Sequence, residues 1–351
     1  MLLLENIPLA PLTTLKIGGP SRYFVEAKNT GEVQEAVTFA RSRDLPLFVL
    51  GGGSNLLVAD VGWPGLVLKV ALQGIDQRSA HDDEGKVVFD VGAGESWDKF
   101  VSHAVIARCA GVECLSGIPG SVGGTPVQNV GAYGQEVSET IASVQVLDLK
   151  DAQVRELCPE ACEFTYRASI FNTTERGRFI VLHVTYALTP GGSPRITYAD
   201  LKRHFEGRET PPNLAETREA VRHIRALKGM LITPGDVDCQ SAGSFFKNPV
   251  LSAEQHEDLK QRAAARGFTL PNYPALETRK KVSAAWLVER SGFAKGFGFG
   301  RVGISSKHAL AIVNRGGATA ADVLALKEQI QTRVEEIWGI RLEPEPVMVG
   351  F

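Results

Sequence analysis

The sequence predicts an α+β fold over its 351 residues. Amphipathic stretches with the period of a helix recur along the chain, and short apolar runs typical of strands lie between them. A third observation is the stretch IPGSVGGTPVQNVGAYGQE at residues 118–136. It is too rich in glycine for either element, and glycine is used where φ is positive or where a backbone approaches another group closely. This stretch therefore predicts a main-chain wall against a flat or anionic ligand.

The first part of the chain supplies two helices. Thr30 is placed to cap a helix over residues 31–43, with an apolar face that includes Val33 and Val37. Ser96 is placed to cap a second helix, which Gly111 is expected to end. Strands are predicted at residues 47–50, 66–70, 87–91, 144–149 and 179–188.

The last third has its own elements. Ser252 and Gln255 form a capping-box signature for a helix that runs toward residue 266, and Thr319 with Asp322 starts another. Residues 286–288 are predicted to be helical, and residues 308–313 to form a strand. A polar stretch around residue 210 marks a candidate boundary. We expect parts at 1–75, 76–228 and 229–342, with a tail at 343–351.

Composition indicates a soluble globular protein, because hydrophobic residues make up 44% and charged residues 22% of the chain. The net charge of −2 gives no electrostatic footprint for nucleic acid. No apolar run reaches membrane-spanning length, and the N-terminal residues have no basic segment ahead of an apolar one. We therefore expect a cytoplasmic protein that binds neither nucleic acid nor membrane.

The cysteines indicate free thiols rather than a metal centre. The chain has five, namely Cys109, Cys114, Cys158, Cys162 and Cys239. None forms a CxxC pair, and no His or Cys partner stands at a usable ligand spacing. We expect no metal site and a reducing compartment.

A second glycine loop follows the strand at residues 47–50. Successive glycines let backbone N–H groups turn toward one point, so Gly51-Gly52-Gly53-Ser54-Asn55 is suited to hold a pyrophosphate. The alternative is a tight strand connection with no ligand.

Two other glycine patterns are rejected as dinucleotide fingerprints. Residues 298–303 match GxGxxG, but they precede a strand and lack a surrounding βαβ unit. Gly92-Ala93-Gly94 fails because Trp97 takes the place of the third glycine. A dinucleotide would therefore be bound here by a fold other than the Rossmann fold.

Five motifs in order resemble one family. They are LGGGSNLL (50–57), the stretch at 118–136, TYRASIF (165–171), SAGSFFKNP (241–249) and LEPE (342–345). Together they are similar to the UDP-N-acetylenolpyruvoylglucosamine reductases, also called UDP-N-acetylmuramate dehydrogenases or the MurB family. The resemblance runs from about residue 13 to residue 345.

This resemblance implies a two-part FAD-binding domain of the vanillyl-alcohol-oxidase (PCMH) type and a C-terminal α+β substrate-binding domain. It implies an NADPH-dependent, cytoplasmic reductase of peptidoglycan precursor synthesis that acts on a UDP-sugar, and we expect this protein to be a monomer. No histidine lies in either glycine loop, so we expect FAD to be held without a covalent bond. No Rossmann selector residue exists from which to choose between NADPH and NADH.

The resemblance also implies where FAD is held. The GGGSN loop would hold the FAD pyrophosphate, and the stretch at 118–136 would lie along the flavin. The cofactor-binding residues expected are Gly51, Gly52, Gly53, Ser54, Asn55, Leu56, Gly117, Pro119, Gly120, Ser121, Gly123, Gly124, Asn129, Gly131 and Ala132.

Three residues match the family's catalytic positions. Arg167 would grip a carboxylate in two-point geometry, and Ser244 would be the proton donor. Glu345 would stabilise developing charge together with Arg167, and Glu343 is the competing assignment.

Four residues match substrate-binding positions, namely Tyr133, Tyr198, Lys228 and Asn248. Arg225 is the alternative to Lys228 at the diphosphate, because residues 229–240 differ from the sequence of many relatives. Two other functions stay open, an FAD-linked oxidase of a sugar or alcohol and a non-catalytic binder of UDP-sugars. The first would turn over with oxygen and without NADPH, and the second would not need Arg167, Ser244 and Glu345 together.

Overall fold

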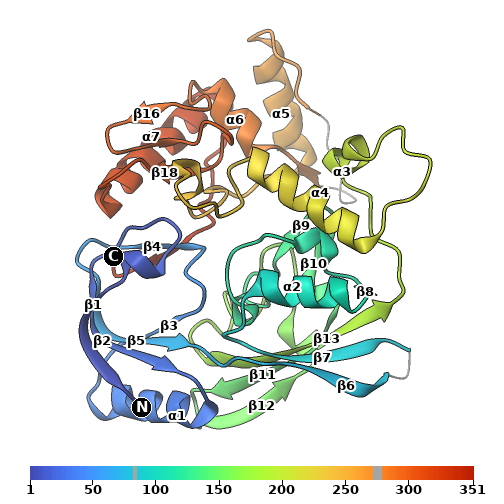
Figure 1. Cartoon of the computed structure of the whole chain (residues 1–351). Helices are drawn as coiled ribbons and strands as arrows, with labels where there is room; N and C mark the ends of the chain where they lie inside the picture. Colours follow the sequence, from blue (N-terminus) through green and yellow to red (C-terminus); the bar gives the residue numbers. More distant parts are fainter. Residues whose placement is uncertain (82–84, 272–278) are drawn as a thin grey trace. The chain divides into compact units, whose positions relative to one another are not determined.

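The computed structural model describes residues 1–81, 85–271 and 279–351 (Figure 1). The chain forms two compact units. Unit 1 comprises Met1–Ile7, Ser21–Gly53 and Trp63–Leu231, and unit 2 comprises Pro8–Pro20, Ser54–Gly62 and Ile232–Phe351. The predicted boundary after residue 228 lies near the last of these divisions. The further boundaries at 75 and 342 stay predictions.

The first sheet of unit 1 has the strand order β1-β2-β5-β3. These strands are β1 (Leu3–Pro8), β2 (Pro20–Ala27), β5 (Trp63–Val70) and β3 (Leu47–Leu50). β2 and β3 both run parallel to β5. Helix α1 (Thr30–Ser42) packs its apolar face into the same core as Leu66 and Leu68.

The second sheet of unit 1 is antiparallel, with the order β12-β11-β13-β7-β6. Its strands are β12 (Gln153–Leu157), β11 (Ile141–Asp148), β13 (Phe179–Pro190), β7 (Val87–Gly92) and β6 (Ile75–His81), and β8 (Cys109–Ala110) pairs with the end of β13. Helix α2 (Trp97–Ile106) lies over this sheet (Figure 1). Phe100 of α2 stacks on Tyr186 of β13, with ring centroids 4.7 Å apart.

Unit 1 is completed by two helices and a hairpin. The helices are α3 (Ala199–His204) and α4 (Leu214–Leu227), and β9 (Gly131–Ala132) pairs with β10 (Gln135–Glu136). The sequence analysis did not predict α4, which begins in the polar stretch around residue 210. Its start is fixed by a capping box between Asn213 and Glu216.

Unit 2 contains three longer helices and short strands. The helices are α5 (Ala253–Ala264), α6 (Ala284–Arg290) and α7 (Ala320–Trp338). The strands are β4 (Leu56–Val58), β14 (Val250–Leu251), β15 (Lys280–Lys281), β16 (Gly298–Phe299), β17 (Val302–Ile304), β18 (Ile312–Asn314) and β19 (Val347–Val349). β4 and β19 pair in parallel, and Leu57 joins a core that includes Phe245 and Trp338. Single 3-10 turns lie at Ala10–Leu12, Glu113–Leu115, Val122–Gly124, Val137–Glu139, Glu160–Cys162 and Val237–Cys239.

Three local predictions are corrected. Asn29 caps α1, because its side chain accepts from the Glu32 N–H at 2.9 Å and Thr30 is already helical. Gly111 does not end α2, which stops at Ile106, before Arg108 turns the backbone to a φ of 58°. Residues 308–311 are not strand, because the Ser305 hydroxyl accepts from nearby N–H groups and holds a turn.

The rejected GxGxxG segment is a β-hairpin. Gly298 pairs with Gly303 and Phe299 with Val302, so no helix follows the glycines. The α+β fold class is confirmed. No helix among residues 1–81, 85–271 and 279–351 has the length and apolar character needed to cross a membrane.

Candidate active site

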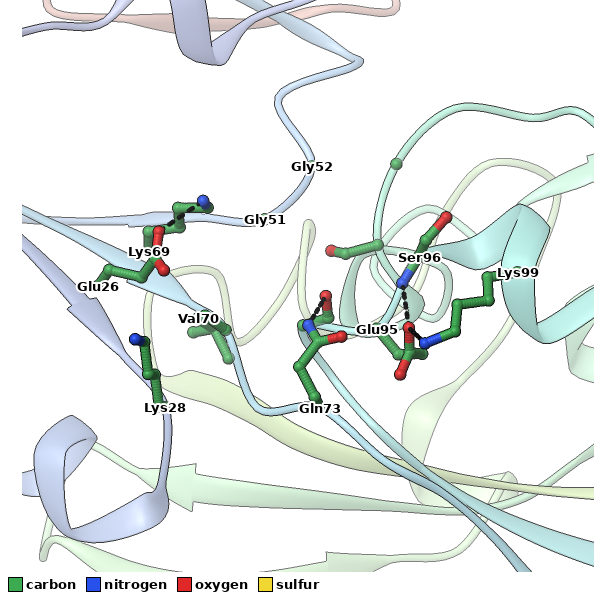
Figure 2. Close-up of a pocket in the computed structure, with 14 residues that line it drawn as sticks. Glu26, Lys28, Gly51, Gly52, Lys69, Val70, Gln73, Glu95, Ser96 and Lys99 are labelled. Carbon is green, nitrogen blue, oxygen red and sulfur yellow. Dashed lines mark hydrogen bonds and ion pairs between the residues drawn. The ribbon is translucent and has the colours of Figure 1, made fainter.

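A pocket of about 810 Å³ lies in unit 1 where the two predicted glycine loops meet (Figure 2). Gly51 and Gly52 come from the loop after β3, and Gly120 and Ser121 come from the glycine-rich stretch. The remaining lining residues are Glu26, Lys28, Lys69, Val70, Ala71, Gln73, Gly94, Glu95, Ser96 and Lys99. Sequence reasoning did not find these ten.

The glycines are required because the two loops approach each other closely. A Cβ on Gly52 would stand 2.4 Å from Gly120 Cα, and one on Gly51 would stand 2.8 Å from the Ser121 hydroxyl oxygen. The first distance leaves no room for a side chain because the Gly120 backbone cannot yield, whereas a side chain at Gly51 would push the Ser121 hydroxyl out of its present position. The wall of the pocket is therefore main chain, as a cofactor that lies against backbone requires.

The Ser121 side chain carries an unused hydrogen-bonding group in this wall. Its Oγ is buried and has no hydrogen-bond partner among the described residues. A buried hydroxyl without a partner is costly unless a ligand supplies one. The glycine cradle and this hydroxyl fit a cofactor with polar oxygens, such as the phosphates of FAD.

Charged residues line both sides of the pocket. Lys69 pairs with Glu26 at 2.7 Å, and Lys99 pairs with Glu95 at 3.0 Å (Figure 2). Burial opposes ionisation of Glu95, but hydrogen bonds from Lys99 and from the N–H groups of Gly74 and Ser96 outweigh it and lower its pKa. Lys28 adds a third cation to these two pairs, so the lining carries excess positive charge suited to a diphosphate.

The sequence did mark one of the missed lining residues, Gly94. Gly94 belongs to the Gly92-Ala93-Gly94 pattern that fails as a dinucleotide fingerprint. A Cβ on Gly94 would stand 2.4 Å from Ala71 Cα, so the glycine allows two chain segments to meet at the pocket. The other missed residues lie on strands β2 and β5, on helix α2 and in the short connections beside these elements, where no local pattern distinguishes them.

The rest of the glycine-rich stretch has defined structural roles. Asn129 is buried, and its Nδ2 donates to Glu136 at 2.9 Å and to the Thr165 carbonyl at 3.1 Å. A Cβ on Gly123 would stand 2.6 Å from Ala93 Cβ, and Gly131 and Ala132 form β9. None of these lines the pocket, nor do Gly117, Pro119 and Gly124. Their contact with FAD stays a prediction.

The end of the GGGSN motif belongs to the other unit. Gly53, with a φ of 65°, is the last residue of its segment in unit 1, whereas Ser54, Asn55 and Leu56 belong to unit 2. Leu56 pairs with Val347 in the β4–β19 ladder. Their predicted roles toward FAD stay predictions.

Arg167 lies in unit 1 with a φ of 57°, in the left-handed region that non-glycine residues seldom adopt. Its Nη1 donates to the Asn129 carbonyl at 3.3 Å, and its Nη2 donates to the Gly131 carbonyl. The main chain of the glycine-rich stretch therefore orients the guanidinium. Unusual backbone of this kind is found at functional sites.

Ser244 and Glu345 are neighbours within unit 2. The Glu345 N–H donates to the carbonyl of Phe245, the residue after Ser244, at 2.9 Å. Asn55 Nδ2 donates to the Glu345 carbonyl at 3.3 Å. Glu343, the competing assignment, has a side chain that is 77% exposed and pairs with Lys247 at 3.7 Å.

The predicted substrate residues of unit 1 form one cluster. The rings of Tyr133 and Tyr198 meet edge to face with centroids 5.3 Å apart, and Lys228 Nζ lies 5.8 Å from the Tyr133 ring centre. Lys228 Nζ also donates to Asp200 at 2.6 Å. Burial raises the pKa of Tyr133, although the positive charges of Arg225 and Lys228 act to lower it.

Asn248, the fourth predicted substrate residue, belongs to unit 2. Its Oδ1 accepts from the Ala284 N–H at 2.9 Å, at the first residue of α6. The amide therefore has a structural role in addition to any role toward substrate.

The fold and the pocket define a class, the FAD-binding proteins. Residues 21–157 match a family model described as an FAD binding domain. Residues 234–349 match the model described as the C-terminal domain of UDP-N-acetylenolpyruvoylglucosamine reductase. The chain is therefore a flavoprotein with a second, C-terminal domain.

Relatives cover the whole chain. A UDP-N-acetylenolpyruvoylglucosamine reductase of Thermobifida fusca is 46% identical over 353 residues, which is 99% of this chain and 98% of the relative. One of Streptomyces coelicolor is 43% identical over 99% of this chain and 90% of the relative. The crystal structure of the Thermus caldophilus reductase (MurB) matches with a TM-score of 0.65 at 27% identity, covering 99% of this chain and 98% of that one. The chain belongs to the UDP-N-acetylenolpyruvoylglucosamine reductase family.

Proposed function

We propose that the protein is an FAD-dependent reductase that converts UDP-N-acetylenolpyruvoylglucosamine to UDP-N-acetylmuramate during peptidoglycan precursor synthesis, with NADPH as electron donor. The observation that carries the proposal is the 46% identity to a reductase of that name over 99% of the chain. The glycine cradle with its unpartnered Ser121 hydroxyl supports the cofactor.

The reaction sets three requirements for the protein. Reducing an enol ether beside a carboxylate places a hydride on one carbon, builds negative charge toward the carboxylate, and then needs a proton on the neighbouring carbon. FAD, when bound, supplies the hydride. Charge stabilisation and proton delivery are left to side chains.

Arg167 is proposed to bind the substrate carboxylate. A guanidinium stays charged and presents a planar fork that matches a carboxylate. Its anchorage to the carbonyls of Asn129 and Gly131 supports this role, because a donor that is already oriented stabilises developing charge without reorganising.

Ser244 is proposed to deliver the proton, and Glu345 to act on the same developing charge. A hydroxyl is a weak acid, but an enol-type carbanion is a strong base, so the transfer is downhill. The bond from the Glu345 N–H to the Phe245 carbonyl supports a joint role for these two residues. The ion pair of exposed Glu343 with Lys247 supports the choice of Glu345.

The cluster of Tyr133, Tyr198 and Lys228 is proposed to bind the UDP-sugar, with Lys228 at the diphosphate. Lys228 is held by Asp200 and lies over the Tyr133 ring, so its charge is oriented. Asn248 is assigned to the same ligand.

We further propose a monomer in the cytoplasm that binds no nucleic acid, which size-exclusion chromatography and nucleic-acid binding assays test.

Rapid-mixing spectroscopy tests the reaction. The purified protein should be yellow, bleach anaerobically with NADPH, and recover its colour when the enolpyruvyl substrate is added. A protein that stays colourless after incubation with FAD would refute the proposal. Recovery of colour by oxygen alone, with no response to the substrate, would instead indicate an oxidase.

Ser244→Ala separates the two half-reactions. Bleaching by NADPH should keep its rate, whereas reoxidation by the substrate should slow by about a hundredfold or more, as expected for loss of a general acid. Equal damage to both half-reactions would remove Ser244 from the role of proton donor.

A further inference from the structure

The backbone N–H and carbonyl of Gly117 are both bonded to charged side chains within unit 1. Its N–H donates to Asp98 Oδ1 at 2.6 Å, and its carbonyl accepts from Arg225 Nε at 3.1 Å. Gly117 has a φ of 71°, so the chain reverses there just before the pocket wall at Gly120 and Ser121. The pocket wall therefore begins a few residues after a glycine whose N–H and carbonyl are both held.

Asp98 also connects two helices. It lies in the first turn of α2, and Arg218 of α4 grips it at two points, Nη1 to Oδ1 at 2.6 Å and Nη2 to Oδ2 at 2.9 Å. Arg222 adds a contact to Oδ2 at 2.7 Å. Burial opposes the charge of Asp98, but Arg218 and the Gly117 N–H outweigh it and lower its pKa. The carboxylate is therefore ionised and uses both of its oxygens.

The other end of α4 reaches the predicted substrate cluster. Arg225 is buried, and its Nη2 donates to the Met230 carbonyl at 2.7 Å. Lys228 follows at the end of α4 and lies over the Tyr133 ring. One helix and the residue that follows it thus contact both Gly117, before the pocket wall, and the tyrosine cluster.

We propose that Asp98 is a positioning residue for FAD. Asp98 is not one of the described residues that line the pocket. It accepts from the Gly117 N–H and thereby sets where residues 118–121, including the Ser121 hydroxyl, stand. The proposal rests on the function above in taking FAD as the ligand. The competing explanation is an ion pair that only ties α2 to α4.

Two substitutions separate these explanations. Asp98→Ala removes the charge and the acceptor, whereas Asp98→Asn removes the charge and keeps an oxygen that can accept from the Gly117 N–H. Titration of apoprotein with FAD, followed by quenching of flavin fluorescence, should show affinity lowered about tenfold in Asp98→Ala, the value of one charge-assisted hydrogen bond. The loss of FAD affinity in Asp98→Asn should be clearly smaller. Thermal unfolding of the same apoproteins should show a loss of stability in both variants, because both lack the ion pair.

Asp148→Asn is the matched control. Asp148 is likewise gripped by two arginines, Arg178 and Arg155, in unit 1, and none of these three lines the pocket. It should lower thermal stability and leave FAD affinity within about twofold of wild type. If Asp98→Ala does not accumulate as folded protein, Asp98→Ser replaces it, because serine is tolerated near a helix start and its side chain is one bond shorter.

Each result has one meaning. Unchanged FAD affinity in Asp98→Ala, with lowered stability, would overturn the positioning role and leave the proposed reductase function unaffected. Equal loss of affinity in Asp98→Ala and Asp98→Asn would also overturn it, because the acceptor would then have no effect. A wild-type protein that takes up no FAD would overturn the proposed function itself.

Discussion

Ser121 shows how one residue can be placed for a ligand rather than for the fold. Its hydroxyl has no partner among the described residues, so Ser121→Ala removes nothing that stabilises the apoprotein. If FAD supplies the missing partner, the variant should bind FAD about tenfold more weakly while its apoprotein unfolds at or slightly above the wild-type temperature. Fluorescence titration and thermal unfolding measure the two effects.

Ser291→Ala is the control for that prediction. Ser291 is a buried serine of unit 2 whose hydroxyl donates to the Leu287 carbonyl at 2.7 Å and accepts from Trp338 Nε1 at 3.0 Å. Its loss should cost about 1–3 kcal/mol of stability and leave FAD affinity unchanged. An apoprotein of Ser121→Ala that is destabilised to the same degree would contradict the role assigned to Ser121.

The sequence predicted residues of the pocket where a motif marks them, and not elsewhere. Gly51, Gly52, Gly120 and Ser121 stand in glycine loops whose composition fits no regular element. Glu95 and Lys69 carry no such mark, because a charged residue on a strand or before a helix looks the same whether it faces solvent or a pocket. Only the pairing of distant segments shows which way these side chains face.

At the scale of elements, two helices differ in whether the residue before their first turn forms a capping hydrogen bond. The Thr319 side chain accepts from the Asp322 N–H at 3.1 Å, and Asp322 accepts from the Thr319 N–H at 2.9 Å. Thr319→Ala should therefore cost about 1 kcal/mol, measured by urea unfolding of the apoprotein. Ser96 occupies the same position before α2 but makes no capping bond. Ser96→Ala should cost less than about 0.5 kcal/mol, and equal losses would contradict this assignment.

Elements were predicted best where the signal is local. The capping boxes of α5 and α7 are formed by residues three positions apart, and both helices begin as expected. Helix α4 was missed because its buried face includes the polar residues Thr217 and Arg225 and because it begins in a polar stretch after two prolines. The error at residues 308–311 has a similar origin, since an apolar run does not reveal that the Ser305 hydroxyl holds it in a turn.

For the whole molecule, the division into units could not be predicted from local patterns. Segments Pro8–Pro20 and Ser54–Gly62 precede most of unit 1 in sequence and yet belong to unit 2. The reason is long-range pairing. Asn55 bonds to Glu345 across 290 positions, and Leu57 packs in the core of Phe245 and Trp338. The resemblance to a family identified candidate site residues in both units. The predicted boundaries, in contrast, divided the chain into consecutive parts, which cannot describe units built from separate segments.

The acid stability of the molecule should depend on Asp148. Hydrogen bonds from Arg178 hold its pKa far below the ordinary value of 3.8, against the effect of burial. The unfolded chain therefore takes up this proton at a higher pH than the folded chain, and stability present above about pH 4 is lost as the pH falls further. Asp148→Asn should be less stable than wild type at pH 7, but its free energy of unfolding should fall less steeply as the pH is lowered. The difference in free energy between the two proteins should shrink by up to about 1.4 kcal/mol per pH unit. Urea unfolding of both apoproteins between about pH 2 and pH 7 measures this, and parallel curves would show that folding leaves the pKa of Asp148 unchanged.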